Sequence, residues 1–337
     1  MKWRRILAAA TILALVGLVV GVAVVLEAKL QRPYQGYDLS APVVIKSGMT
    51  ARAVARRLAA AGVVEQGGLF TAWLWWTGQT GSIHAGEYRF SQPKSMAEVA
   101  EIITTGRVVM HSVTVPEGST RWQVARAIAA AGFGSYEEAL SATADIGLIR
   151  DLDPQATSLE GYLYPDTYMA AASEGAVDLV AAMVKRFRNL WTADITAAAR
   201  EIGLSLHEVV ILASLIEAET PSAQERPLVS AVFHNRLGRG MLLQTDPTVL
   251  YAMRLAGRDE RTIRRSDLQR DSPYNTYRYA GLPPGPIGNP RATSIDAALH
   301  PAHVDWLYFV SRNDGTHAFS RTLGEHNRMV NQYQRQP

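Results

Sequence analysis

The chain has 337 residues, of which 47% are hydrophobic and 19% charged, and it contains no cysteine. This composition excludes a disordered tail and a disulfide scaffold, and the length predicts about two domains. The net charge of +3 is the excess of 34 basic over 31 acidic side chains, and it equals the three basic residues Lys2, Arg4 and Arg5. The remainder of the chain has no overall attraction for polyanions, so we expect no nucleic-acid partner.

The first predicted element is an apolar helix near the N-terminus. Residues 6–26 contain no charged side chain, and as a helix they reach about 32 Å, which crosses a bilayer. A cleaved signal peptide is the alternative, but its apolar run is shorter, about 7 to 15 residues, and ends in small residues. Basic residues in segment 1–5 outnumber those just after the span, which favours a cytoplasmic N-terminus. The sequence therefore predicts a single-pass anchor that spans the lipid bilayer, with the rest of the chain exported.

A linker and an internal repeat follow the anchor. Residues 27–42 contain two prolines and several polar residues, which predicts a tether. Residues 43–63 match residues 113–133 at ten of 21 positions, including a Gly-x-Thr turn that begins at Gly48 and at Gly118. Each copy has a short apolar strand, an N-capping threonine, an amphipathic helix and a terminating glycine. We predict a strand-turn-helix unit for each copy.

An aromatic run continues the first copy. It contains Trp73, Trp75 and Trp76, and a strand at 86–90 and a helix over 95–106 are expected after it. We expect the tryptophans to be packed core or a cover for the sheet, and a sugar-stacking platform is the alternative. Further helices are predicted within 174–201.

The most unusual predicted helix lies between Ser205 and Thr220. It is apolar on almost every side, so we expect it to be buried. Its last turn nevertheless carries Glu217 and Glu219, at the end where the helix dipole disfavours negative charge. Two positions apart, the side chains point about 200° away from each other, so they cannot both line one site. At least one of these negative charges needs a partner that compensates it.

Three later segments combine hydroxyl, amide and aromatic groups with prolines and glycines: residues 244–248, 274–277 and 281–290. They are too stiff to collapse and too polar to be core, so they are predicted to be the walls of a cleft. A short helix near 294–300, a strand at 306–310 and a polar tail complete the chain.

The residue types in the sequence limit the kinds of catalysis that we expect. The sequence has no His-Glu-x-x-His helix, and a proline separates the close pair His300 and His303, so we expect no metal. It also lacks a Gly-x-Ser-x-Gly elbow, a phosphate loop and a dinucleotide fingerprint, so we expect no cofactor. Acid–base catalysis by a carboxylate remains.

A glutamate on a buried helix suits such chemistry. An apolar setting raises the pKa of a carboxyl group, so the group holds a proton near neutrality and can protonate a glycosidic oxygen. The alternative for a single buried glutamate is an ion pair with a core arginine. Position at the end of the helix, facing hydroxyl-rich loops, favours catalysis.

Several ordered motifs together resemble the endolytic murein transglycosylase, or YceG-like, family. They are Leu159-Glu-Gly-Tyr-Leu-Tyr-Pro-Asp-Thr167, Ala213-Ser-Leu-Ile-Glu-Ala-Glu-Thr220, Val232-Phe-His-Asn-Arg-Leu237, Leu243-Gln-Thr-Asp-Pro-Thr-Val249, Tyr274-Asn-Thr-Tyr277, Gly281-Leu-Pro-Pro-Gly-Pro286 and His300-Pro-Ala302. The resemblance covers the chain from the anchor to about residue 335.

This resemblance implies an inner-membrane lytic transglycosylase with no cofactor. The family cleaves nascent peptidoglycan between N-acetylmuramic acid and N-acetylglucosamine and leaves 1,6-anhydro-N-acetylmuramic acid ends. The resemblance also implies that membrane peptidoglycan synthases are partners and that Glu217 is catalytic. The expected fold is α+β, divided into a cytoplasmic tail (1–5), a transmembrane anchor (6–26), a linker (27–42), a LysM-like region (43–110) and a mixed α/β catalytic domain (111–335).

In the implied mechanism Glu217 first gives a proton to the leaving sugar oxygen and then takes one from the muramic C6 hydroxyl. Gln244, Asp246, Tyr274, Asn275 and Tyr277 are candidates for binding sugar groups or orienting that glutamate, and each has a structural role as its alternative. Glu219 is a further candidate for orienting it, or bonds only to nearby backbone.

Two rival functions stay open at this point. The first is a non-catalytic peptidoglycan-binding anchor. The second is a muramidase that uses water, and it requires a second carboxylate, Asp246 or Asp166, at about 5 to 9.5 Å from the acid.

Overall fold

The computed structural model describes residues 2–36, 41–260 and 262–335. Contacts divide the chain into two compact units. The first, here called the anchor unit, comprises Met1–His111 with Ala171–Ser173, and the second, here called the distal unit, comprises Ser112–Ala170 with Glu174–Pro337. Both mix helices with short strands, as the sequence predicts, and each strand pairs in a two-stranded sheet.

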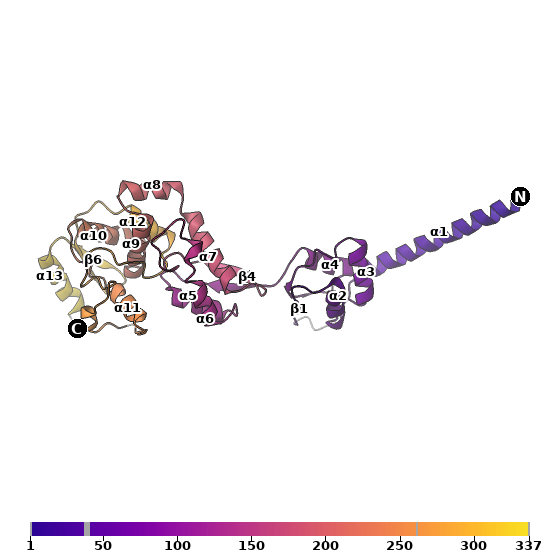
Figure 1. Cartoon of the computed structure of the whole chain (residues 1–337), viewed down its shortest axis with the longest axis horizontal. Coiled ribbons are helices and arrows are strands. Elements are labelled where there is room, and N and C mark those ends of the chain that lie inside the picture. The colour runs from indigo at the N-terminus through magenta and orange to yellow at the C-terminus, as the bar shows by residue number, and fades with distance from the viewer. Residues whose placement is uncertain (1, 37–40, 261, 336–337) are drawn as a thin grey trace. The chain divides into compact units, whose positions relative to one another are not determined.

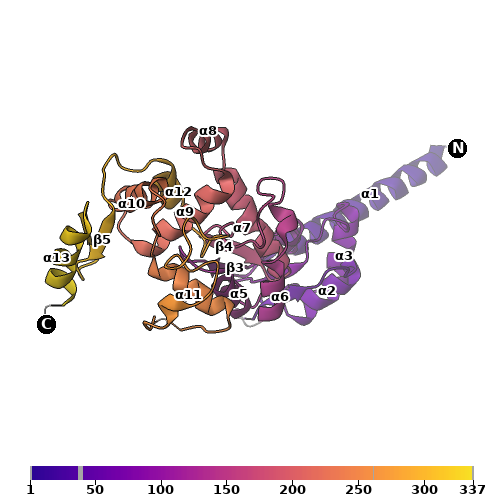
Figure 2. The ribbon, with the colours of Figure 1, turned by 60° about the vertical axis from the view of Figure 1, so that its left-hand side comes forward.

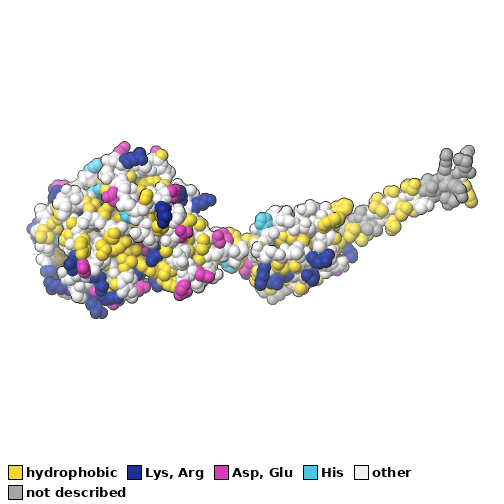
Figure 3. All heavy atoms as spheres, in the orientation of Figure 1, with side chains coloured by type: hydrophobic (Ala, Val, Ile, Leu, Met, Phe, Trp, Pro, Cys, Tyr) yellow, Lys and Arg dark blue, Asp and Glu magenta, His cyan; other side chains and the backbone are white. Residues whose placement is uncertain are grey.

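A long helix, α1 (Lys2–Gln31), begins the anchor unit. Within the described residues it is the one helix long and apolar enough to cross a membrane, and Figure 3 shows hydrophobic side chains along its described part. The helix extends to Gln31, which lies inside the predicted tether of residues 27–42. Burial of Leu30 against the core of the anchor unit stabilises this last turn. Part of the tether, residues 37–40, lies outside the described residues.

The rest of the anchor unit has two strands and three helices: β1 (Val43–Ile45), α2 (Ala51–Ala60), α3 (Gly67–Trp76), β2 (Gly86–Tyr88) and α4 (Met96–Thr104). The strands pair antiparallel with Val43 opposite Tyr88. Thr50 caps α2 and Gly62 follows it at φ 70°, as the repeat predicts. The core expectation for the tryptophan run is wrong at Trp75 and Trp76, which are 75% and 80% exposed.

The distal unit contains the second repeat copy and the later elements, although Met110, His111 and Ala171, at the ends of two strands, belong to the anchor unit. Thr120 and Gln123 form a capping box at the start of its first helix, so the copy is again strand, turn and helix. The elements are β3 (Met110–Thr114), α5 (Arg121–Ala130), α6 (Tyr136–Ala142), η1 (Ile146–Leu148), β4 (Thr167–Ala171), α7 (Ala176–Leu190), α8 (Ala193–Glu201), α9 (Leu206–Glu219), α10 (Arg226–Gly238), α11 (Asp246–Leu255), η2 (Asp267–Gln269), α12 (Ala292–Leu299), β5 (Tyr308–Ser311), β6 (His317–Ser320) and α13 (Leu323–Gln334).

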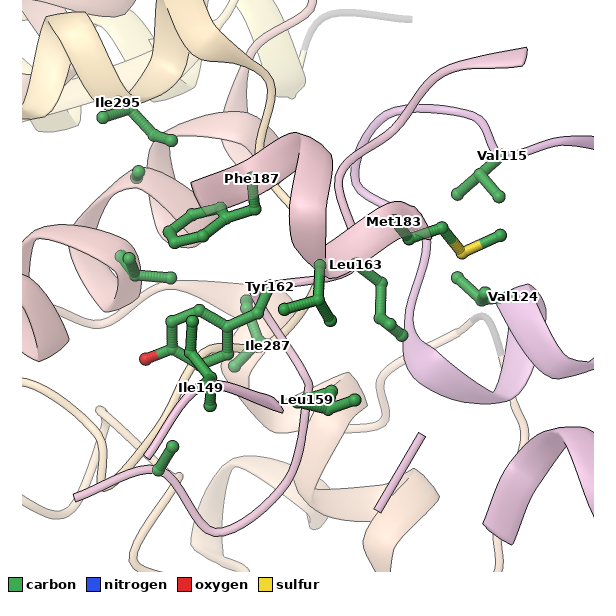
Figure 4. Close-up of a cluster of buried hydrophobic side chains, with 14 of the residues drawn as sticks. Val115, Val124, Ile149, Leu159, Tyr162, Leu163, Met183, Phe187, Ile287 and Ile295 are labelled. Carbon is green, nitrogen blue, oxygen red and sulfur yellow. The ribbon is translucent and has the colours of Figure 1, made fainter. Parts of the chain in front are cut away.

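One continuous apolar core holds the distal unit together. Figure 4 shows part of this core, including Tyr162 and Phe187. The rings of these two residues pack edge to face, with 5.1 Å between their centres. The predicted capping box of Ser205 and Glu208 begins α9, which is buried along its apolar length and packs against α10 and α12. A rigid, buried α9 fixes the position of the glutamates at its end.

The structure adds regular elements to two of the predicted segments. The predicted cleft wall at 244–248 ends in the first turn of α11, because Pro247 fits the start of a helix, where no amide donor is needed. The expected polar tail instead contains β6 and α13. There β6 pairs antiparallel with β5, and Phe319 packs near Phe309 at 6.1 Å between ring centres.

Candidate active site

The two carboxylates at the end of α9 lie in different surroundings, as their spacing predicts. The helix ends at Glu219, and the backbone of Thr220 is extended (φ −142°), with Pro221 immediately after it. Glu217 faces α12, whereas Glu219 faces the N-terminal end of α11. Each side of this helix end is therefore a separate candidate site.

Glu217 is fully engaged with its neighbours. Its side chain is only 3% exposed and forms an ion pair with the Arg291 guanidinium at 2.9 Å. The backbone N–H of Arg291 and the hydroxyl of Ser294 also donate to this carboxylate, at 3.1 and 2.8 Å. Arg291 in turn lies 3.6 Å from Glu117. These contacts satisfy a buried negative charge.

This setting differs from the one expected for a proton-holding Glu217. From the sequence, that side chain is expected in the apolar setting of a buried helix, and an ion pair with a core arginine is the alternative. The structure shows the ion pair, formed by Arg291. The buried carboxylate of Glu217 is therefore held by a guanidinium, a hydroxyl and a backbone amide.

Glu219 has the setting that was expected of its neighbour. The pKa of Glu219 is raised to about 7, mainly by burial of its carboxyl group and to a smaller extent by the negative charge of Asp246. The Thr245 hydroxyl donates to the carboxylate, and the charges of His317 and Arg236 also lower the pKa, with smaller effects than burial. A group of this kind exchanges its proton near neutral pH.

A cavity of about 400 Å³ lies beside Glu219. Its lining includes three of the predicted cleft residues, Gln244, Asp246 and Tyr277, and it includes side chains from α10, β5 and β6. The Tyr277 hydroxyl donates to Asp246 at 2.6 Å. The structure therefore gathers a titratable acid, a second carboxylate, an amide and a phenol around one space.

The cavity wall contains a strained backbone. Gln244 has φ 52°, a left-handed conformation that is uncommon for a residue other than glycine. Its N–H donates to the Thr276 carbonyl at 3.1 Å, and the Thr245 N–H donates to the Thr276 hydroxyl at 3.1 Å. These bonds join two sequence motifs and hold the Gln244 side chain at the exposed edge of the cavity. Strain of this kind persists where the surroundings enforce it, and often at functional sites.

Tyr274 and Asn275 have structural positions instead. The Asn275 side chain is buried and donates to the carbonyls of Leu268 and Arg270 at 3.1 and 2.7 Å. Its carbonyl oxygen accepts from the Tyr277 N–H at 3.0 Å, which orients the loop that carries Tyr277. Tyr274 packs against Tyr251, with 4.9 Å between ring centres. These contacts match the structural alternative named for both residues, and a contact with sugar stays a prediction.

His317 and Arg236 belong to the cavity but were not among the predicted site residues. Arg236 lies within a quoted motif, and its guanidinium donates to the carbonyls of Leu243 and Leu307 at 2.8 and 2.6 Å. His317 lies on β6, and its Nδ1 is 2.7 Å from a carboxylate oxygen of Glu225. No local sequence pattern marks this histidine, because β6 itself was expected to be a polar tail.

A raised pKa alone does not identify a site, as Glu160 shows. Burial raises the pKa of Glu160 to about 8. However, the side chain is enclosed, and it accepts hydrogen bonds from the Arg121 N–H, the Tyr251 hydroxyl and the Asn289 amide at 2.9, 3.1 and 3.2 Å. Glu160 therefore connects separate segments of the core, whereas Glu219 borders open space. For metals, the described part of the chain contains no group of three or more His, Cys, Asp or Glu side chains placed to hold an ion.

Comparison of the sequence with known proteins identifies its family. The model of the YceG-like family matches residues 43–332. A Bacillus subtilis protein named endolytic murein transglycosylase is 33% identical over 305 residues, which cover 86% of this chain and 83% of that protein. A Streptococcus pneumoniae protein of the same name is 28% identical over 321 residues, and the match spans only 57% of its length.

A solved structure supports the same family. The crystal structure of a YceG-like protein from Listeria monocytogenes matches with a TM-score of 0.59 and 32% identity, and the match covers 86% of this chain and 98% of that one. On the family match and these relatives, the chain belongs to the YceG-like family.

Proposed function

We propose that this protein is a membrane-anchored lytic transglycosylase that cleaves peptidoglycan glycan strands, with Glu219 as its general acid and base. The shared name of the relatives supports the reaction class. The observation that carries the assignment of the residue is the cavity beside Glu219, together with a pKa of about 7 for this carboxyl group. The proposal moves the catalytic role from Glu217, which Arg291 neutralises, to the second glutamate of the motif.

In the first step the protonated Glu219 donates its proton to the oxygen of the glycosidic bond, and the N-acetylglucosamine side leaves. Asp246, whose charge favours the protonated form of Glu219, supports this step. The negative charge of Asp246 also stabilises the positive charge that develops on the muramic ring. The Tyr277 hydroxyl holds Asp246 in place.

In the second step the Glu219 carboxylate takes the proton of the muramic C6 hydroxyl as its oxygen bonds to C1. This closure gives the 1,6-anhydro end, returns the proton to Glu219 and consumes no water. Because the nucleophile belongs to the substrate, the reaction needs no nucleophilic side chain. The Thr245 hydroxyl, which donates to Glu219, stabilises the carboxylate between the two steps.

A water-using muramidase is the second candidate, and one observation favours it. Asp246 lines the same cavity as Glu219 and provides the second carboxylate that such a reaction needs. The other carboxylate considered, Asp166, instead pairs with Arg186 at 3.2 Å on the surface. Activation of a water molecule by Asp246 would leave reducing ends instead of anhydro ends.

The membrane anchor is also part of the proposal. The apolar helix α1 supports a single-pass anchor in the bacterial inner membrane, with both globular parts extracytoplasmic and with membrane peptidoglycan synthases as partners. A LysM-like character for residues 43–110 is retained as a prediction.

The test uses the full chain in detergent micelles with purified sacculi, and mass spectrometry of the products. Anhydro ends support the transglycosylase, reducing ends support the muramidase, and no products support a non-catalytic anchor. Glu219→Gln should abolish cleavage while circular dichroism and thermal unfolding stay near wild type. Glu217→Gln is the matched control two residues away. If it alone abolishes cleavage in a folded protein, the catalytic role returns to Glu217.

A further inference from the structure

The anchor unit exposes two tryptophans side by side in sequence. Trp75 and Trp76, at the end of α3, are 75% and 80% exposed, whereas Phe70 and Leu74 of the same helix are fully buried. A pair of large apolar side chains held in water is costly, and such groups commonly mark a surface that contacts another phase or molecule. The position of α3 relative to the anchor indicates which contact this is.

The anchor fixes the height of this unit above a membrane. The uncharged run of α1 ends at Leu26, and Leu30 is already buried in the core of the anchor unit. Four helical residues rise about 6 Å. The headgroup region of a bilayer is about 5 to 8 Å deep on each side. The part of the anchor unit nearest α1 therefore lies at the depth of the lipid headgroups.

The helix that ends in the exposed tryptophans is on that part of the unit. Helix α3 lies next to the C-terminal end of α1 in both Figure 1 and Figure 2, and Leu30, Phe70 and Leu74 share one apolar cluster. Trp75 also lines a groove of about 560 Å³ with Arg52 and Arg56 of α2. Both arginines are exposed.

We propose that this face, formed by Trp75, Trp76, Arg52 and Arg56, docks onto anionic phospholipid headgroups. The inference rests on the proposed membrane span of α1. Tryptophan rings favour the boundary between headgroups and acyl chains, and exposed guanidinium groups bind lipid phosphates. The docked face holds the anchor unit against the bilayer, so α1 is not its only attachment. A glycan-stacking role for the same tryptophans is disfavoured, because the short distance to the span places them among lipids.

The experiment reconstitutes the full chain into vesicles of phosphatidylethanolamine and phosphatidylglycerol whose acyl chains are brominated near the glycerol end. Bromine quenches tryptophan fluorescence on contact. Since Trp3 and the three tryptophans of α3, Trp73, Trp75 and Trp76, are the ones expected near lipid, replacing the exposed pair Trp75 and Trp76 with phenylalanine should remove about half of the quenching. Trp191→Phe, in the distal unit, is the matched control and should remove little.

Arg52→Gln with Arg56→Gln tests the charged part of the surface. Quenching in this double variant should fall in phosphatidylglycerol vesicles and stay unchanged in neutral phosphatidylcholine vesicles, and high salt should reproduce the loss in the wild type. Equal quenching in the wild type and the tryptophan variant would overturn the proposal. So would loss of wild-type quenching when soluble chitin oligosaccharides are added, since that result assigns the tryptophans to sugar. A chain that does not float with vesicles refutes the anchor itself, whereas one that floats without quenching refutes only the docking.

Discussion

The two sides of the end of α9 differ in one respect that decides their chemistry. Both carry a glutamate, two residues apart on the same helix, and Glu217 is buried whereas Glu219 is half-buried. On the α12 side, Arg291 supplies a full counter-charge to Glu217. On the α11 side, Glu219 has a hydroxyl donor and a neighbouring carboxylate, and it borders a cavity. Burial alone therefore does not make an acid catalyst, because the partner of the buried group determines which protonation state is favoured.

The largest effect expected from this comparison is on Glu219 itself. An amide cannot donate a proton of suitable acidity, so Glu219→Gln should lower the cleavage rate by about 10² to 10⁴ fold. The rate of release of soluble fragments from labelled sacculi measures this loss. Glu219→Asp keeps the acid but withdraws it from the cavity, and it should retain more activity than the amide variant. A Glu219→Gln enzyme with wild-type turnover would contradict the assignment.

The pH dependence of the rate tests the same group without mutation. The first step needs protonated Glu219, and the pKa of this carboxyl group is about 7. We therefore expect kcat/KM to be level just below pH 7 and to fall about tenfold per pH unit above it. A rate that rises through pH 8 would mean that Glu219 acts only as a base.

The free energy of unfolding should also depend on the protonation of Glu219. In the folded state the pKa of Glu219 is raised above its ordinary value of 4.5, and that of Glu160 is raised in the same direction. Between the unfolded and folded values the folded state binds more protons, so the free energy of unfolding falls as pH rises from about 4.5 to about 7. Urea unfolding at a series of pH values measures this slope, and Glu219→Gln should reduce it.

Asp246→Asn should shift the pH profile in a defined direction. Removal of the neighbouring negative charge lowers the pKa of Glu219, so the alkaline limb should move to lower pH by about one unit or less. Asparagine still accepts the Tyr277 hydrogen bond, which preserves the wall of the cavity. A large loss of rate at every pH, with reducing ends among the residual products, would favour the muramidase.

His317→Gln should produce a smaller shift with the opposite sign. The charge of His317 lowers the pKa of Glu219, so removal of this side chain should move the alkaline limb to higher pH. His317 is held by Glu225, and Arg236 and Asp246 are the other charged groups that affect Glu219. A merely structural role for His317 would lower stability or rate without moving the limb. The pH profile of kcat/KM separates the two cases.

Local patterns explain which parts of the fold were predictable. Ser205 and Glu208 specify the start of α9, and its apolar length specifies burial, so its position and the divergence of its two glutamates follow from sequence. The identity of the counter-charge does not, because Arg291 lies 74 residues further along the chain. Folding alone brings it to Glu217.

The same limit applies to the cavity. The Gln244 motif and Tyr277 were recognised as a polar wall, but the inward turn of Asn275 depends on carbonyls that only the folded loop presents. The pairing of β6 with β5 likewise depends on contacts between Phe309 and Phe319 and not on a strong strand pattern. No sequence motif therefore predicts that His317 belongs to the site.

The smallest effect on activity is expected on the other side of the helix end. Glu217→Gln keeps the hydrogen bonds from Ser294 and from the Arg291 backbone but removes the ion pair. It should lower the free energy of unfolding by about 1–3 kcal/mol. Arg291→Gln should cost more, because it leaves the enclosed carboxylate of Glu217 without its counter-charge. The double variant should recover part of that loss, and chemical denaturation of all four proteins gives the coupling between the two residues. If Glu217→Gln has wild-type kcat and reduced stability, this side of α9 stabilises the fold and the Glu219 side performs the chemistry. If Glu217→Gln loses kcat without losing stability, the two roles are reversed.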